Sequence, residues 1–202
     1  MNLFSITICT VLVEKSPQAL PLGAACIASY LKAKLPIQCK VNLVDWNLEE
    51  CPNSNKITQY LKDTESGIFL FSVFVWNRNL LCQIASELKK IVPNCITIAG
   101  GPEVTACPES FFCDTFGDSK PFDYVISGEG EIESEKLIQN LISGNRPETK
   151  IFYGKRALLA ELPSPYLDGT LDATKYEGAL WELARGCPYK CSYCYESKGE
   201  KK

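Results

Sequence analysis

Histidine is absent from this 202-residue chain, and methionine occurs only once. Without an imidazole, the chain cannot supply a histidine general base or a histidine ligand to a metal. Positive charge is also scarce. The 21 basic side chains are outnumbered by 24 acidic ones, and the net charge of −3 gives no general attraction to phosphate backbones. We therefore expect no nucleic-acid partner.

The opening segment "NLFSITICTVLV" lacks the positively charged leader and the small-residue cleavage site of a secretion signal. It is also shorter than the roughly 20 residues that a membrane-spanning helix needs, so we expect a buried strand and no membrane association. Eleven cysteines without a secretion signal favour free thiols and metal ligands over a disulfide framework. These features together predict a cytoplasmic protein.

Short apolar runs alternate with longer amphipathic ones over most of the chain, a pattern typical of strand–helix units around a parallel sheet. The predicted strands are 5–13, 40–45, 67–73, 95–99 and 124–127, and the predicted helices are 22–34, 55–63, about 80–92 and 131–142. We therefore predict an α/β fold, namely a flavodoxin-like (Rossmann-like) five-stranded parallel sheet with helices on both faces.

The character of the sequence changes after Gly144. Residues 1–144 are predicted to form the flavodoxin-type domain. Residues 145–179 mix proline, glycine and charge without sustained periodicity, which indicates a linker. Residues 180–202 are predicted to begin a second unit, opening with the apolar run "LWELARG" directly before a cluster of cysteines.

Three of these cysteines, Cys187, Cys191 and Cys194, lie within eight residues and can bind one compact metal group. Structural zinc sites usually have two ligand pairs far apart in sequence, whereas this chain has one triplet and no histidine. A redox Cys-x-x-Cys pair would leave Cys187 without a role. An iron–sulfur cluster held by three thiolates keeps one iron open for a substrate or cofactor, and we favour this alternative.

The segment "RGCPYKCSYCYE" resembles the Cys-x-x-x-Cys-x-aromatic-Cys signature of radical S-adenosylmethionine (SAM) enzymes. The resemblance implies that Cys187, Cys191 and Cys194 hold a 4Fe-4S cluster whose open iron binds SAM, with Tyr193 near the adenine. One electron from the reduced cluster would then cleave SAM to a 5′-deoxyadenosyl radical. An electron donor such as flavodoxin or ferredoxin would supply that electron.

Glycine-rich and aromatic segments follow the predicted strands, where open α/β sheets bind their ligands: "FVWNRN", "GGPEV" and "GEGE". The glycines allow close approach of backbone to a ligand, or they only form tight turns. Trp76 either covers the core or lies against a flat macrocycle. The acidic residues Glu129 and Glu131 either stabilise the start of a helix or contact a ligand.

The order of "LPLGAACIASYLK", "FSVFVWN", "IAGGPEV", "DYVISGEGE" and "LPSPYLDG" before the cysteines is similar to proteins that join a cobalamin-binding domain to a radical SAM domain. By this resemblance, a corrinoid would lie over the loops that carry Trp76, Gly100, Gly101, Pro102, Glu103, Gly128 and Glu129. The chain departs from the Asp-x-His-x-x-Gly motif of other cobalamin domains because it has no histidine. The cobalt of a bound cobalamin would therefore be five-coordinate, water-bound or held by another side chain.

The resemblance as a whole implies the amino-terminal part of a cobalamin-dependent radical SAM enzyme that acts on an unidentified substrate, with methyl transfer as one outcome. Residues 180–202 would supply only the first strand and cysteine loop of a truncated radical SAM barrel, so we do not expect this chain alone to catalyse turnover. The alternative is a non-catalytic flavodoxin-like binding module with a structural or vestigial cysteine loop.

Replacing Cys187, Cys191 and Cys194 together by alanine should abolish iron binding, because the cluster would lose all three of its thiolate ligands. After anaerobic reconstitution with iron and sulfide, we expect brown, iron-containing wild-type protein and a colourless triple variant. Cys95→Ala, outside the triplet, should retain the iron. Preferential binding of zinc by the wild type would contradict the radical SAM interpretation.

Overall fold

The fold is a parallel sheet with helices on both faces, as the computed structural model shows for residues 4–14, 19–113, 120–176, 178–186, 189 and 191–193. The sheet has six strands in the order β2-β1-β3-β4-β5-β6, and every neighbouring pair is parallel. The strands are β1 (Phe4–Leu12), β2 (Cys39–Asn47), β3 (Ile68–Ser72), β4 (Ile96–Gly100), β5 (Tyr124–Gly128) and β6 (Ile151–Gly154).

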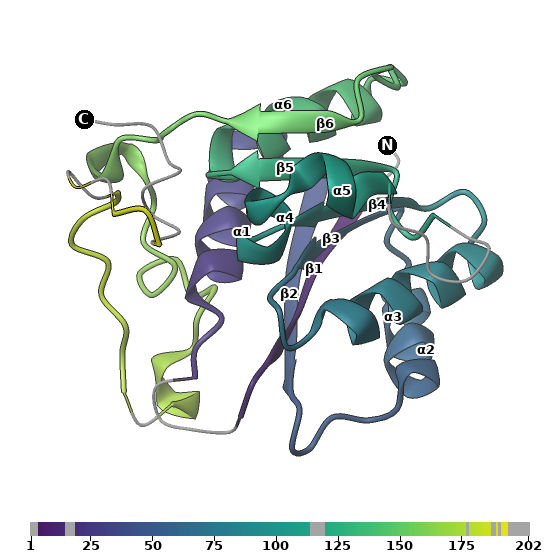
Figure 1. Cartoon of the computed structure of the whole chain (residues 1–202), viewed down its shortest axis with the longest axis horizontal. Helices are drawn as coiled ribbons and strands as arrows, with labels where there is room; N and C mark the ends of the chain where they lie inside the picture. The colour runs from purple at the N-terminus through teal and green to yellow at the C-terminus, as the bar shows by residue number, and fades with distance from the viewer. Residues whose placement is uncertain are drawn as a thin grey trace.

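Helices form a layer on each face of the sheet (Figure 1). The helices are α1 (Leu22–Lys34), α2 (Ser54–Asp63), α3 (Arg78–Ile91), α4 (Pro102–Ala106), α5 (Pro108–Cys113) and α6 (Glu131–Ile142). Residues of α1 and α6 share one core cluster, and residues of α2 to α5 share the other. Strand order reverses direction between β1 and β3, so the fold has the topological switch point of doubly wound sheets.

The alternation of side chains along each strand separates the two cores. In β3, Ile68 and Leu70 pack beneath α1 and α6, whereas Phe69 and Phe71 pack beneath the helices of the opposite face. Cys9 and Cys95 are buried in the second of these cores, as expected of small apolar side chains, and burial raises the pKa of Cys95 to about 11. Such thiols remain protonated and are poor metal ligands.

The predicted α/β architecture is confirmed, but the predicted number of five strands is one too low. The sixth strand, β6, lies within the segment that the sequence assigned to a linker, and it pairs with β5. It is a short edge strand whose side chains are mostly half-buried, so its sequence lacks a continuous apolar run. Helices α4 and α5 were also not predicted, because each is too short to show a helical period.

The region around "LWELARG" differs from the expected start of a barrel. Residues 179–185 carry no helix or strand in the described part of the chain. Cys187 and Cys194 lie outside the described residues, so the structure describes only Cys191 of the predicted metal ligands.

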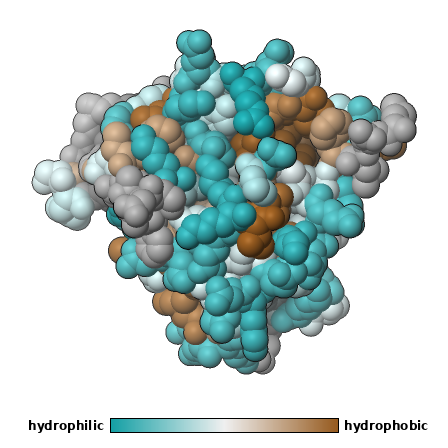
Figure 2. All heavy atoms as spheres, turned by 90° about the vertical axis from the view of Figure 1, so that its right-hand side faces the viewer, coloured by the Kyte–Doolittle hydropathy of each residue, from teal (hydrophilic) through white to brown (hydrophobic). Residues whose placement is uncertain are grey.

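Figure 2 views the molecule from the side at which β5 and β6 begin, and the surface there is mainly hydrophilic with small separate apolar groups. None of the helices in the described ranges combines the length and apolar character that crossing a bilayer requires.

Replacing Phe69 by alanine should lower the free energy of unfolding by about 3–5 kcal/mol, because the ring is fully buried in the central strand β3 and leaves a cavity. Urea denaturation monitored by circular dichroism measures this change. Ile37→Ala removes an apolar side chain that is fully exposed, and it should change the stability by about 0.5 kcal/mol or less. Similar losses for both variants would contradict the assignment of the core.

Candidate functional site

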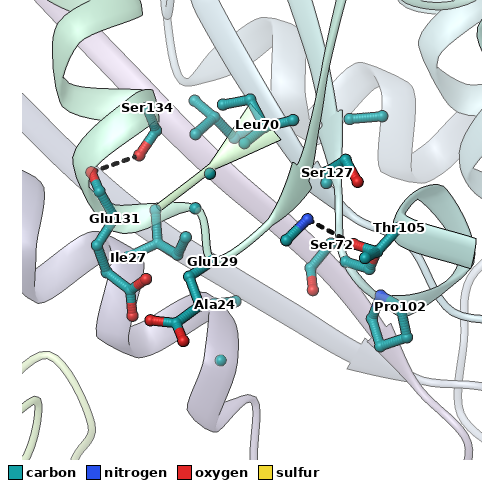
Figure 3. A pocket seen from close by; sticks show the side chains of 18 of the residues that line it. Ala24, Ile27, Leu70, Ser72, Pro102, Thr105, Ser127, Glu129, Glu131 and Ser134 are labelled. Carbon is teal, nitrogen blue, oxygen red and sulfur yellow. Dashed lines mark hydrogen bonds between the residues drawn. The ribbon is translucent and has the colours of Figure 1, made fainter. Parts of the chain in front are cut away.

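A cavity of about 920 Å³ opens at the carboxyl ends of β3, β4 and β5. Its lining also includes the start of α1, the start of α6, the end of β6 and the segment around Arg185. Figure 3 shows residues of α1 and α6, such as Ile27 and Glu131, on one side of the strand ends and Thr105 of α4 on the other. The carboxyl edge of a parallel sheet is where such folds bind their ligands.

One side of the cavity is apolar. The sheet contributes Ile8, Leu70, Ile98 and Ile126. Their side chains lie on the face of the sheet that packs against α1 and α6. Helix α1 contributes the small residue Gly23, and a side chain added there would meet no atom within 4 Å. A small residue at this position of α1 therefore keeps open the space between the helix and the sheet.

Another part of the cavity wall is polar and is built from the ends of β3 and β5 and from helix α4. Ser72, Thr105 and Ser127 line it with hydroxyl groups. The Thr105 hydroxyl donates to the carbonyl oxygen of Gly101 at 3.0 Å and accepts from the backbone amide of Gly128 at 2.9 Å (Figure 3). This one side chain therefore joins the loop after β4 to the end of β5.

Two glycines allow the backbone segments around the cavity to approach closely. Gly101 has φ +107°, and a Cβ there would lie 2.6 Å from the carbonyl oxygen of Val73. At Gly154, the last residue of β6, a Cβ would lie 1.8 Å from the carbonyl oxygen of Glu129. These glycines are needed for packing between loops, whether or not a ligand is bound.

Charged side chains form the wall next to α6. The Glu129 carboxylate accepts from the backbone amide of Ala157 at 2.9 Å and lies 3.4 Å from Arg156 Nε. Arg185 reaches the same wall from the carboxyl-terminal segment and donates to Glu129 at 2.9 Å, to Glu131 at 2.7 Å and to Glu182 at 2.9 Å. Glu131 is only 4% exposed, so this carboxylate depends on Arg185 for compensation of its charge.

The surroundings of Arg185 keep its charge fixed. Although burial opposes the charged form, the hydrogen bonds that Arg185 donates to Glu131 and Glu182 raise the pKa of Arg185. Burial and the nearby Glu131 carboxylate raise the pKa of Cys26 in α1 to about 11, so this thiol stays protonated beside the cavity. Among the described residues, this wall therefore offers paired charges, and the neighbouring Cys26 is a neutral thiol.

A family model described as the B12 binding domain matches residues 9–154, from β1 to the last residue of β6. This chain belongs to the B12-binding domain family. The matched range includes the end of β1, all of β2 to β6, and the cavity lining except Ile8 and the residues after Gly154.

Relatives of this B12-binding domain include cobalamin-dependent radical SAM methyltransferases, which confirms the resemblance seen in the sequence. TokK of Streptomyces tokunonensis bears that name and is 34% identical over 154 residues, which are 64% of this chain and 22% of TokK. An uncharacterized methyltransferase of Pyrococcus horikoshii is 28% identical over 199 residues, which are 88% of this chain and 40% of that protein. The chain thus spans less than half the length of either relative.

Among solved structures, the chain is similar to the cobalamin-dependent SAM radical enzyme OxsB with aqua-cobalamin and SAM bound. The TM-score is 0.73 at 24% identity, and the match covers 95% of this chain and 28% of OxsB. This similarity supports the flavodoxin-like fold of the B12-binding domain.

The structure brings most of the predicted corrinoid contacts to the cavity. Its lining includes Gly100, Gly101, Pro102, Gly128 and Glu129. As cofactor contacts these residues remain predictions, and Glu129 is in addition engaged by two arginines.

Three other predicted contacts lie outside the cavity lining. Glu103 forms an ion pair with Arg78. Tyr193 is 91% exposed. Trp76 stacks on Phe74 with ring centroids 4.5 Å apart, and Phe74 is the residue of this pair that lines the cavity.

The loop that carries Trp76 is held by a buried amide. Asn77 is fully buried, and its side chain donates to the carbonyl oxygens of Val11 and Ser72 and accepts from the amide of Phe74. The Trp76 indole also donates to Val11 at 3.1 Å. The loop after β3 is therefore fixed to the end of β1 by side-chain hydrogen bonds.

Several lining residues were not predicted from the sequence. They include Thr105, Arg156 and Arg185. The signal for Arg185 was present in "RGCPY", but the motif indicates only the metal ligands and does not show that the arginine pairs with Glu129 and Glu131. Nothing local in the sequence links residues that are more than 50 positions apart.

Replacing Gly154 by alanine should lower the free energy of unfolding by about 1–3 kcal/mol, because the new methyl group would force the Glu129 backbone away from β6. Thermal unfolding by calorimetry measures the loss. Gly67→Ala is the matched control, since a Cβ there meets no atom within 4 Å, and we expect a change of about 0.5 kcal/mol or less. Equal stability of the wild type and Gly154→Ala would contradict this prediction, because it would show that the loop around Glu129 can move to accommodate the methyl group.

Proposed function

We propose that this chain is the cobalamin-binding part of a radical SAM enzyme. The observation that carries the proposal is the cavity at the carboxyl edge of a B12-binding fold, because residues 182 and 184–186, directly before the cysteine triplet, form part of its wall. In one short stretch the chain thus passes from the cobalamin site to the predicted cluster site.

The two sides of the cavity fit the chemistry of cobalamin. The apolar space between α1 and the sheet suits an aromatic base such as dimethylbenzimidazole, and its lining comes from Ile8, Leu70 and Gly23. The hydroxyls of Ser72, Thr105 and Ser127 suit the amides and the phosphate of the cofactor. When bound, cobalamin supplies a carbon–cobalt bond for methyl transfer.

The chain offers no histidine to the cobalt. We propose that this chain would hold a bound cobalamin without a histidine ligand. The apolar side of the cavity would exclude water from the bound cofactor. The loops after the strands would bind the amide groups at the edge of the cobalamin.

We further propose that Cys187, Cys191 and Cys194 hold a 4Fe-4S cluster that binds SAM, with Tyr193 near its adenine. Support comes from the cysteine spacing and from the relatives that are cobalamin-dependent radical SAM methyltransferases. Methyl transfer to an unidentified substrate is the reaction that these relatives favour, and an electron donor such as flavodoxin or ferredoxin would reduce the cluster.

Filling the apolar space should weaken cobalamin binding at least about tenfold, the ratio that corresponds to 1.4 kcal/mol. Gly23→Leu places a side chain into open space beside the cavity without a clash at Cβ. We expect hydroxocobalamin to bind the wild-type chain with a 1:1 stoichiometry, measured by gel filtration and by its visible spectrum, and to bind this variant weakly.

The matched control is Ala33→Leu, which places the same leucine side chain at an exposed position of α1. It should bind hydroxocobalamin as the wild type does. Absence of binding by the wild type would contradict the proposed function, and equal binding by the wild type and Gly23→Leu would place the ligand elsewhere.

A further inference from the structure

We propose that Arg185 is a positioning residue that ties the segment leading to the cysteine triplet to the wall of the cobalamin cavity. The bridge consists of Arg185, Glu129 and Glu131. The inference rests on the proposed function, because it concerns how the two cofactor sites of one enzyme are held relative to each other.

The bridge spans parts of the chain that are far apart in sequence. Arg185 contacts Glu129 with Nη1 and Glu131 with Nη2, at 2.9 and 2.7 Å. These glutamates stand on either side of Gly130, between the end of β5 and the first turn of α6. Figure 3 shows the two carboxylates lying side by side at the cavity. A single guanidinium therefore fastens residues 182–186 to the junction between β5 and α6.

Burial makes this bridge difficult to replace by water. The side chains of Arg185 and Glu131 are only 11% and 5% exposed. Removing one partner of a buried ion pair leaves the other charge uncompensated, which is far more costly than losing an exposed pair. Arginine also suits the site better than lysine, because its planar fork reaches two carboxylates at once.

The neighbouring residues support the same position of the segment. Arg156, after β6, also contacts Glu129, so this carboxylate lies between two guanidiniums. The next residue after Arg185 is Gly186, where a Cβ would lie 1.6 Å from Arg156 Nη2. The segment thus passes beside the end of the Arg156 side chain, and the φ of +75° at Gly186 favours glycine there.

Two consequences follow for the proposed enzyme. Arg185 lies two positions before Cys187 in the sequence, so the bridge acts on the segment that leads directly to the predicted cluster ligands. Glu129, Glu131 and Arg185 also line the cavity, so a ligand in the cavity and the segment 178–186 share one wall. Occupation of the cavity should therefore further order the segment, and the bridge should transmit this effect.

Hydrogen exchange of the 202-residue chain, measured by mass spectrometry with and without hydroxocobalamin, tests the bridge. In the wild type we expect partial protection in residues 178–186, where the Leu180 amide donates to the Tyr166 hydroxyl at 3.1 Å, and stronger protection with hydroxocobalamin. In Arg185→Gln we expect exchange there to be at least about tenfold faster, with unchanged protection of β3 and β4. We also expect hydroxocobalamin, added at a concentration that saturates this variant, to leave its segment 178–186 unprotected.

Three further variants separate positioning from a general loss of stability. Arg185→Lys should restore part of the protection, because it keeps the charge but not the fork. The double variant Arg185→Gln/Glu131→Gln should lose no more protection than Arg185→Gln alone, as expected for two partners of one interaction. Arg146→Gln changes an exposed arginine and should behave as the wild type does.

The outcomes distinguish this inference from the proposed function. If Arg185→Gln keeps the segment as protected as in the wild type, the bridge does not position it, whether or not hydroxocobalamin binds. If the segment is released but hydroxocobalamin protects it equally in both proteins, the coupling through Arg185 is refuted. If the wild type does not bind hydroxocobalamin at all, the proposed function itself fails.

Discussion

The site depends on the parallel register of β3, β4 and β5. Because these strands run in the same direction, their carboxyl ends meet at one edge, and the loops that follow them enclose a single cavity. Thr105 shows how close the loops are, since its hydroxyl contacts the backbone on both sides. An antiparallel strand anywhere in this group would send one loop to the opposite edge.

The cavity combines two environments that are built by different means. Its apolar side follows from the two-residue period of the strands, which turns Ile8, Leu70 and Ile126 toward α1. Its charged wall is made by tertiary contacts of Arg185 with glutamates near α6. The first environment is a by-product of the core, whereas the second exists only when distant segments have come together.

This difference explains how much the sequence could predict. The sheet and the long helices were predictable because burial imposes a regular period, and helix α6 was expected over the same residues, 131–142. Strand β6 was not predictable, because this edge strand is held by backbone pairing with β5 and its sequence shows little apolar pattern. The glycines at the cavity were predicted from their places after strands. Arg185 was not, because an ion pair over more than 50 positions leaves no local signal.

The buried amide of Asn77 has a consequence for binding of any ligand in the cavity. Its three hydrogen bonds hold the loop after β3 in one conformation before a ligand arrives. A loop that is already ordered loses little conformational entropy when a ligand binds. The contacts of a ligand with Phe74, which lines the cavity, therefore contribute more of their free energy to the affinity.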